Sequence, residues 1–351
     1  TRMDPQAATT VFREGEQGEI VKLLAESPVA VTEDVRHLPS RKAPFRIGWR
    51  AVLLLAASAA VLLLLYVGDR EQNASTAPKT SDVSALQALD LVGCMPGRLP
   101  DFWEAQAPSK ALEVRVLTYN LFWWNLFGIR HGNGGSASRL IAASGPFDMM
   151  GFQECEDVAR VLNDAGLSGQ YGFFAGDGSK TSAICMAYRR SSWLLLGQGL
   201  SYVAWDKLGN RAAQWMRLQH IPSGQKVFFA NHHGPLPINS GGRCGGPTTA
   251  YNLLQLIAAH ARFGDMLILV GDFNANGASA TVQHVQWRLR KVYAGAMGGG
   301  IDNVFSNINT KTTTITRNLG NGGSDHDALS VVFKVSGPAR PWWWPWPLPM
   351  F

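Results

Sequence analysis

The chain has 351 residues, of which 46% are hydrophobic and 17% are charged, with a formal net charge of +6. This apolar content is enough to bury a substantial core, so the composition excludes a chain without a hydrophobic core. The length would allow two domains, but sandwich folds often exceed about 200 residues as one unit. The four cysteines show no metal-type spacing, which argues against a zinc site.

The first long apolar run lies near the N-terminus and carries no charge. Residues 51–68, at about 1.5 Å per residue, span about 27 Å, enough for a thin bilayer. Basic residues precede the run at Arg41, Lys42, Arg46 and Arg50. The positive-inside rule then predicts residues 1–50 in the cytosol and the following chain in a lumen or outside the cell. We expect a single-pass signal anchor. A cleaved signal peptide would begin closer to the N-terminus, and a bipartite organelle-targeting leader is the alternative.

Residues 69–110 have the character of a stem between the anchor and a folded domain. A glycosylation sequon, Asn73-Ala74-Ser75, follows the anchor, and residues 82–91 predict a short amphipathic helix. All four cysteines come after the anchor, at Cys94, Cys155, Cys185 and Cys244. In an oxidising compartment they would form two disulfides, for which three pairings are open.

Strand-like and helical runs alternate through residues 111–337, and no internal repeat is visible. A mixture of this kind, with polar groups at the strand ends, suits a two-sheet sandwich flanked by helices. Strands are predicted at 113–119, 148–153, 182–188, 215–220, 227–232, 266–271, 302–305 and 328–335, and helices at 138–143, 156–165, 248–263 and 279–292.

Several of these strands end in a carboxylate, an amide or an imidazole. Strands that end at one edge of a sheet can gather distant residues into a single polar site. The motifs that close an apolar run are Gln153-Glu154, Asn231-His232-His233, Gly271-Asp272-Phe273-Asn274 and Ser324-Asp325-His326.

Groups of these types suit a narrow chemistry. Glu154 can supply a carboxylate to a hard divalent cation, which prefers oxygen ligands and keeps several waters. Asp272 and Asn274 can hold and deprotonate a water. His326 and His233 can donate hydrogen bonds to phosphate oxygens, and Asp302 can keep His326 protonated and oriented. The set predicts metal-assisted phosphoester hydrolysis.

Together these motifs resemble those of the endonuclease/exonuclease/phosphatase superfamily, of which DNase I has the best-known shape. The resemblance covers residues 113–334 and implies an α+β fold, a four-layer α/β/β/α sandwich of two mixed sheets, here preceded by one transmembrane helix. Each motif is weak alone, but chance matches do not arrive in the family's order. The motifs are Leu117-Thr118-Tyr119-Asn120, Gln153-Glu154, Ala187-Tyr188-Arg189, Asn231-His232-His233, Gly271-Asp272-Phe273-Asn274, Ile301-Asp302 and Ser324-Asp325-His326.

The resemblance implies a metal site and a water-positioning pair. Asn120 and Glu154 correspond to metal-site residues, with Asp325 as a further ligand or as a carboxylate just behind the ligands. Asp272 and Asn274 correspond to the pair that positions the attacking water. Mg²⁺ is the expected cofactor, with Mn²⁺ or Ca²⁺ as alternatives.

The resemblance also implies groups that contact the phosphate. His326 corresponds to the histidine that faces the scissile phosphate, paired with Asp302. The family pattern selects His233 rather than His232 as the second functional histidine. Arg189, at the end of a predicted strand, corresponds to an arginine that contacts phosphate.

The substrate class stays open between nucleic acid and phospholipid. Glu156 stands where DNase I-like nucleases carry a basic residue, and an acid there repels nucleic-acid phosphates. The motif that marks inositol phosphatases is also missing from the sequence between Asn274 and Ser324. Residues 111–337 nevertheless carry 19 Lys and Arg against 13 Asp and Glu, an excess that favours a polyanion or an anionic headgroup.

Three further stretches have no fixed role. The loop 235–247, rich in glycine and proline around Arg243 and Cys244, either shapes access to the site or only connects its neighbours. The cluster Arg288, Arg290 and Lys291 is predicted near the end of the helix at 279–292. The tail segment 341–351, rich in tryptophan and proline, would contact the membrane interface, a protein partner or its own domain.

We therefore expect a membrane-anchored, Mg²⁺-dependent phosphodiester hydrolase of the DNase I-like nuclease type. A lipid phosphodiesterase or phosphatase, of sphingomyelinase or phosphoinositide type, is the first alternative, and a non-catalytic scaffold of a membrane assembly is the second. The expected divisions are a cytosolic tail at 1–50, the anchor at 51–68, the stem at 69–110, the catalytic domain at 111–337 and the Trp/Pro-rich tail at 338–351.

Overall fold

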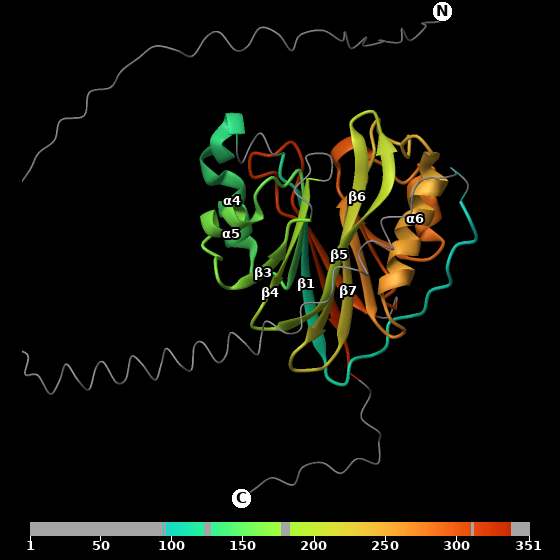
Figure 1. Cartoon of the computed structure of the whole chain (residues 1–351). Coiled ribbons are helices and arrows are strands. Elements are labelled where there is room, and N and C mark those ends of the chain that lie inside the picture. Colours follow the sequence, from blue (N-terminus) through green and yellow to red (C-terminus); the bar gives the residue numbers. More distant parts are fainter. Residues whose placement is uncertain (1–93, 95, 123–127, 177–182, 310–311, 338–351) are drawn as a thin grey trace, which may run out of the picture. The chain divides into compact units, whose positions relative to one another are not determined.

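The computed structural model describes residues 94, 96–122, 128–176, 183–309 and 312–337, which include two six-stranded sheets (Figure 1). The expected anchor at 51–68, the amphipathic helix at 82–91 and the tail at 341–351 lie outside these residues. Within the described ranges, no helix combines the length and the apolar character needed to cross a membrane.

The first sheet has the strand order β11-β12-β1-β2-β4-β3. β1 pairs in parallel with β2, and the other neighbouring pairs are antiparallel. Its strands are β1 (Leu112–Asn120), β2 (Met149–Gln153), β3 (Tyr171–Phe174), β4 (Ile184–Arg189), β11 (Thr313–Asn318) and β12 (Leu329–Val335).

The second sheet has the order β5-β6-β7-β8-β10-β9 and also mixes directions. β7 pairs in parallel with β8, and the remaining neighbours are antiparallel. Its strands are β5 (Trp193–Asp206), β6 (Gly209–His220), β7 (Lys226–His233), β8 (Met266–Asp272), β9 (Arg290–Ala294) and β10 (Asp302–Ser306).

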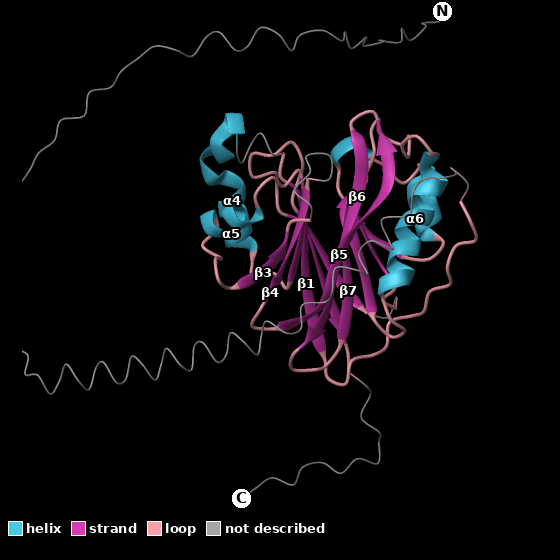
Figure 2. Ribbon diagram, in the orientation of Figure 1, coloured by secondary structure: helices cyan, strands magenta, loops and turns pink. Residues whose placement is uncertain are grey.

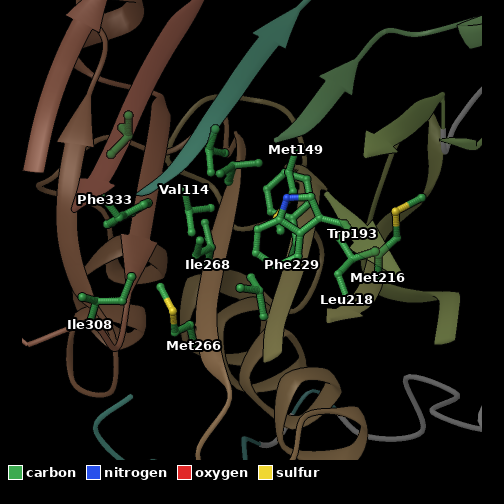
Figure 3. Close-up of a cluster of buried hydrophobic side chains, with 14 of the residues drawn as sticks. Val114, Met149, Trp193, Met216, Leu218, Phe229, Met266, Ile268, Ile308 and Phe333 are labelled. Carbon is green, nitrogen blue, oxygen red and sulfur yellow. The ribbon is translucent and has the colours of Figure 1, made fainter. Parts of the chain in front are cut away.

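The two sheets pack face to face through a shared apolar core. Val114 and Phe333 from the first sheet lie in one buried cluster with Phe229 and Ile268 from the second (Figure 3). Because successive strand residues point to opposite faces, the other face of each sheet needs a separate cover.

Helices supply that cover on both sides (Figure 2). α4 (Ser136–Ser144) and α5 (Val158–Asp164) pack on the first sheet, and α6 (Gly245–His260) and α7 (Ala280–Gln286) pack on the second. Two 3-10 helices, η2 (Gly128–Gly135) and η4 (Met297–Gly299), lie in connections. Two mixed sheets between helical layers fit the DNase I-like sandwich that the sequence predicts.

The expected helix at 279–292 is wrong in its second half. α7 ends at Gln286, and Arg290–Ala294 forms β9, which pairs with β10. Arg290 and Lys291 therefore lie in a strand. The strand expected at 215–220 begins earlier, at Gly209, and β3, β5, β9 and β11 were not among the predicted strands.

Two disulfides join all four cysteines, Cys94 with Cys244 and Cys155 with Cys185. This is one of the three pairings that the sequence leaves open. The first bond connects the segment before β1 to the residue that precedes α6. The second connects the loop after β2 to β4.

Candidate active site

Polar groups from both sheets meet at one edge of the sandwich. Asn120, the last residue of β1, lies opposite Gln153, the last residue of β2. In the second sheet His233, which ends β7, lies opposite Asp272, which ends β8. Asp302 at the start of β10 pairs with the same Asp272. Because parallel strands end at the same edge, residues far apart in the sequence become neighbours here.

Asp302, His326 and Asp272 form the centre of this edge. Nδ1 of His326 lies 2.9 Å from Oδ2 of Asp302 and 3.0 Å from its Oδ1. Nε2 of His326 lies 3.7 Å from Oδ2 of Asp272. All three side chains are buried, and their ligand atoms lie within 4.8 Å of one another. The imidazole is held between two carboxylates.

Asn120 links this centre to Glu154. Its Nδ2 donates to Oδ2 of Asp272 at 3.1 Å and to Oε1 of Glu154 at 3.3 Å. Its Oδ1 accepts a hydrogen bond from the N–H of Phe122 at 2.9 Å. Asn120 therefore draws the two carboxylates together as a donor.

A tight turn joins Asp272 to Asn274. Oδ1 of Asp272 accepts from the backbone N–H of Asn274 at 2.8 Å, and Nδ2 of Asn274 donates to the carbonyl of Gly234 at 3.0 Å. Asn274 and Glu154 both have positive φ, 45° and 51°. Such values are uncommon outside glycine and concentrate at functional sites.

A glycine is required where β7 and β8 leave the sheet. Gly271, just before Asp272, has φ of 148°, and a Cβ there would collide with the carbonyl of His232. A Cβ on Gly234 would collide with the carbonyl of Phe273. These two glycines let the loops after β7 and β8 approach each other closely.

The surrounding carboxylates set the protonation of the centre. Burial alone would lower the pKa of His326, but the hydrogen bond and charge of Asp302, followed by the charges of Asp272 and Asp325, raise it to about 9. Burial, followed by the charge of Asp302, raises the pKa of Asp272 to about 7. Near neutral pH His326 is a cation, and Asp272 can both lose and accept a proton.

The adjacent histidines of β7 face different surroundings. Nε2 of His233 lies 3.5 Å from Oδ2 of Asp272. Nδ1 of His232 lies 2.9 Å from the carbonyl of Ala212, since neighbouring strand residues point to opposite faces. Burial, followed by the charge of Arg211, holds the pKa of His233 well below its usual range. Burial lowers the pKa of His232 to about 4. Of the two, the structure places His233 beside Asp272.

Arg211 is a charged group near this edge that sequence reasoning missed. It lies in β6, is buried, and its Nε donates to Oδ2 of Asp206 at 2.8 Å. Its charge acts on both His233 and His232. No motif marks it. The sequence signal that could have indicated this ion pair is an Asp and an Arg on the two strands of one hairpin.

The loop before β12 brings His326 to the centre. Oγ of Ser324 donates to the carbonyl of Asn120 at 2.8 Å and accepts from the N–H of His326 at 3.1 Å. Asp325 is exposed, and its Oδ1 lies 3.4 Å from Oγ of Ser324. Asp325 therefore adds negative charge beside the centre.

Arg189 is not brought to this edge, contrary to the sequence expectation. β4 runs antiparallel to β2, so the residues that end β4 lie beside Met149, where β2 begins. The guanidinium of Arg189 is paired with the carboxylate of Asp148. Glu154 follows the opposite end of β2. The direction of β4 thus places this arginine at the far edge of the sheet.

The donor set suits a hard divalent cation. Asp272, Asp302 and His326 are the three described residues whose ligand atoms cluster, and carboxylate oxygens are what Mg²⁺, Mn²⁺ and Ca²⁺ prefer. A pKa of about 9 makes His326 positive near neutral pH, so its ring is a poor ligand and the carboxylates, with Glu154, are the better ones. The expected ligand set differs, being Asn120, Glu154 and Asp325.

The sequence model of the Endonuclease/Exonuclease/phosphatase family matches residues 122–326. The chain belongs to this family. Members of the Endonuclease/Exonuclease/phosphatase family are phosphoesterases and nucleases, and the chain has the fold of a hydrolase that acts on phosphoester bonds. No curated protein matches the chain.

Several solved structures are similar in fold. A family protein from Bacteroides thetaiotaomicron is 17% identical, with a TM-score of 0.51 and a match that covers 65% of this chain and 99% of that one. One from Bacteroides vulgatus is 16% identical, with a TM-score of 0.50 and coverage of 64% and 100%. ANGEL2, a 2',3'-cyclic phosphatase, is 12% identical, with a TM-score of 0.50 and coverage of 66% and 98%. Identities this low establish similarity of fold alone.

Proposed function

We propose that the chain is a divalent-metal-dependent phosphodiester hydrolase of the DNase I-like nuclease type. The proposal rests on the contact of the Asp302–His326 pair with Asp272, at the same edge as Glu154 and Asn120. We also propose that residues 51–68 anchor the chain in a membrane, with the catalytic domain in a lumen or outside the cell. That part is supported by the uncharged run and the basic residues before it.

Asp272 is the group suited to take a proton from the attacking water. A pKa of about 7 is near the value at which a general base works best in neutral solution. The N–H of Asn274 holds its Oδ1, and its Oδ2 faces Asn120, His233 and His326. The water oxygen attacks phosphorus and the water proton passes to Asp272; the bond from phosphorus to the leaving oxygen breaks, and that oxygen departs with the electron pair and takes up a proton from solvent.

His326 is suited to stabilise the negative charge that grows on the phosphoryl oxygens. Its Nδ1 is held by Asp302, which leaves the Nε2–H to donate to the phosphate. A preorganised cationic donor of this kind is worth about 100- to 1,000-fold in rate. A cation held by Glu154 would neutralise further charge on the phosphate and the leaving oxygen.

The test is hydrolysis by the purified full chain with Mg²⁺, using plasmid DNA, RNA, sphingomyelin vesicles and phosphoinositides as substrates. His326→Ala should lower the rate by about 100-fold or more. His260→Ala is the matched control, because His260 ends α6 and stacks on Trp215. Unchanged activity in His326→Ala would contradict the role assigned to His326.

Two other outcomes would replace the proposal. Hydrolysis of lipid alone would identify a sphingomyelinase or a phosphoinositide phosphatase. No hydrolysis of any substrate, together with no metal binding that depends on Glu154, would identify a non-catalytic scaffold that retains the fold.

A further inference from the structure

We infer that an open hollow beside the catalytic edge is a nucleotide subsite, in which a base of the substrate strand stacks on Trp205 and Arg243 while Lys207 binds a flanking phosphate. The inference rests on the proposed nuclease function and names the substrate class of that site. The hollow has a volume of about 400 Å³, and Trp205, Lys207, Leu236, Pro237 and Arg243 are among its lining residues. Ligand sites of this size are common in proteins.

The hairpin of β5 and β6 extends past the catalytic edge (Figure 1). Trp205 and Lys207 of this hairpin line the hollow, which therefore lies next to that edge. Ala213 of β6 pairs with His232 of β7, and the strand begins four residues earlier, at Gly209. At about 3.4 Å per residue, the hairpin reaches about 14 Å beyond that pair. Leu236 on the other wall follows His233 by three residues, so their Cα atoms lie at most about 11 Å apart.

Hydrogen bonds fix the hairpin and the loop after β7 to each other. Oδ2 of Asp206 accepts from the N–H of Leu236 at 2.8 Å, and the carbonyl of Trp205 accepts from the N–H of Arg243 at 2.7 Å. The N–H of Asn239 donates to the carbonyl of Asn274 at 2.7 Å. The Cys94–Cys244 disulfide closes the far end of the loop. The walls are therefore preorganised and attached to the turn that holds Asp272.

The hollow offers a flat aromatic and guanidinium surface. Cζ of Arg243 lies 4.6 Å from the centroid of the Trp205 ring, and Trp205 remains 38% exposed. Bases stack on exposed indole and guanidinium faces, and this interaction tolerates any base. A single strand of nucleic acid that extends from the scissile phosphate can supply such a base.

The charge of the hollow favours a phosphate beside that base. Asp206 is paired with Arg211, and the side chain of each is almost fully buried. The negative charge of Asp206 is therefore neutralised by Arg211. Lys207 and Arg243 take part in no ion pair among the described residues. Two unpaired cations and a stacking face match a nucleotide, which carries a phosphate and a planar ring in one unit.

The test compares two short single strands with the purified full chain and Mg²⁺. One is an oligothymidylate, and the other is an abasic strand with the same phosphodiester backbone. For the wild type, kcat/KM should be higher on oligothymidylate by about tenfold or more, because only that strand can stack. Trp205→Ala should remove most of this ratio, and Trp205→Phe should keep most of it. Since both rates come from one variant, partial unfolding does not alter the ratio.

Matched controls come from the opposite end of the sheet. Trp287 is an exposed tryptophan at the end of α7, and Lys226 is an exposed lysine at the start of β7. Trp287→Ala should leave the base-dependent ratio unchanged. Lys207→Ala should raise KM on both strands and weaken the salt dependence of binding, whereas Lys226→Ala should do neither.

Each remaining outcome has a defined meaning. Equal kcat/KM on the two strands for the wild type, or an unchanged ratio in Trp205→Ala, would overturn the subsite while leaving a phosphodiesterase. If Trp205→Ala slowed only sphingomyelin hydrolysis in vesicles, the hollow would be a lipid contact, to which the exposed Leu208 and Ile238 would contribute. If the wild type hydrolysed neither strand and also failed to hydrolyse bis(p-nitrophenyl) phosphate, the proposed function itself would fail, and the subsite with it.

Discussion

Replacing Asp302 by Asn tests how the charge of His326 is set. The substitution keeps the size of the side chain but removes the negative charge that lies 2.9 Å from Nδ1 of His326. This hydrogen bond and charge are the main reason that the pKa of His326 is raised to about 9 in spite of burial. Without them we expect the pKa to fall towards its ordinary value of 6.5.

The change in protonation gives the expected magnitude. At pH 8, a group with a pKa of 9 is about 90% protonated, and one with a pKa of 6.5 is about 3% protonated. If the imidazolium is the active form, Asp302→Asn should slow hydrolysis about 30-fold at pH 8 and less than about twofold at pH 6.

The assay is the pH dependence of kcat on bis(p-nitrophenyl) phosphate with Mg²⁺. The alkaline limb should move from near pH 9 in the wild type towards pH 6.5 in the variant. An NMR titration of the His326 ring, assigned with His326→Gln, measures the same pKa without turnover. Asp327→Asn is the matched control, because it removes a neighbouring carboxylate that is bonded to Asn318 instead.

The reasoning would be refuted by a variant that loses the same factor at every pH. Asp302 would then only hold the ring in place, and the charge of His326 would not depend on it. An unchanged NMR titration would lead to the same conclusion.

Three further predictions follow from the protonation and geometry of the site. Without divalent cations, the free energy of unfolding should fall as pH rises from 6.5 to 9, because the raised pKa of His326 makes the folded state hold more protons than the unfolded state. Each proton that differs fully contributes about 1.4 kcal/mol per pH unit, and urea unfolding at a series of pH values would expose a flat or rising trend as a contradiction. Added Mg²⁺ should raise Tm more at pH 8 than at pH 6, since it binds ionised carboxylates, and Glu154→Gln should reduce the effect in thermal scans. Replacing Cys155 and Cys185 by Ser should weaken Mg²⁺ binding about tenfold in calorimetry, because Cys155 follows Glu154 directly and the disulfide holds Glu154 in position. Equal weakening on loss of the Cys94–Cys244 disulfide would argue against this positioning role.

The position of the site could be predicted because its groups lie at the ends of apolar runs. Asp272 ends a strand whose seven residues are all buried, and the register of β7 with β8 then places His233 beside Asp272. The pairing of Asp302 with His326 joins residues 24 positions apart; it was anticipated from the chemistry of the two side chains, and the family resemblance implies the same pair. Spacing alone does not indicate which acid faces which histidine.

The sequence could not reveal strand direction, and this explains the displaced Arg189. A strand pattern looks the same whether the strand runs parallel or antiparallel to its neighbour, so the edge at which Arg189 lies is a property of the sheet. The helix expected at 279–292 failed for a similar reason. Val282, Val285 and Leu289 follow a helical spacing and are buried, but pairing with β10 overrides that spacing from Arg290 onward.

Arg211 and the Trp205–Arg243 contact were missed because they depend on tertiary structure. Trp205 lies near the end of β5 and Arg243 lies in the loop after β7, and the two residues meet only in the folded domain. Neither residue belongs to a motif. Such contacts determine what surrounds the reacting phosphate, and for this reason the reaction class is more predictable from the sequence than the substrate.

The disulfides connect the site to the proposed location of the domain. Cys155 follows Glu154, and Cys244 closes the loop that leaves His233, so both bonds hold segments next to the reacting groups. Bonds of this kind persist in oxidising compartments and are rare in the cytosol, which supports a lumenal or extracellular domain after the basic flank of residues 41–50. We expect no cysteine of the chain isolated from a eukaryotic host to react with maleimide until a reductant is added. A reactive Cys155 or Cys185 in that preparation, detected by mass spectrometry, would argue that the domain resides in the cytosol and would remove the basis for a preorganised Glu154.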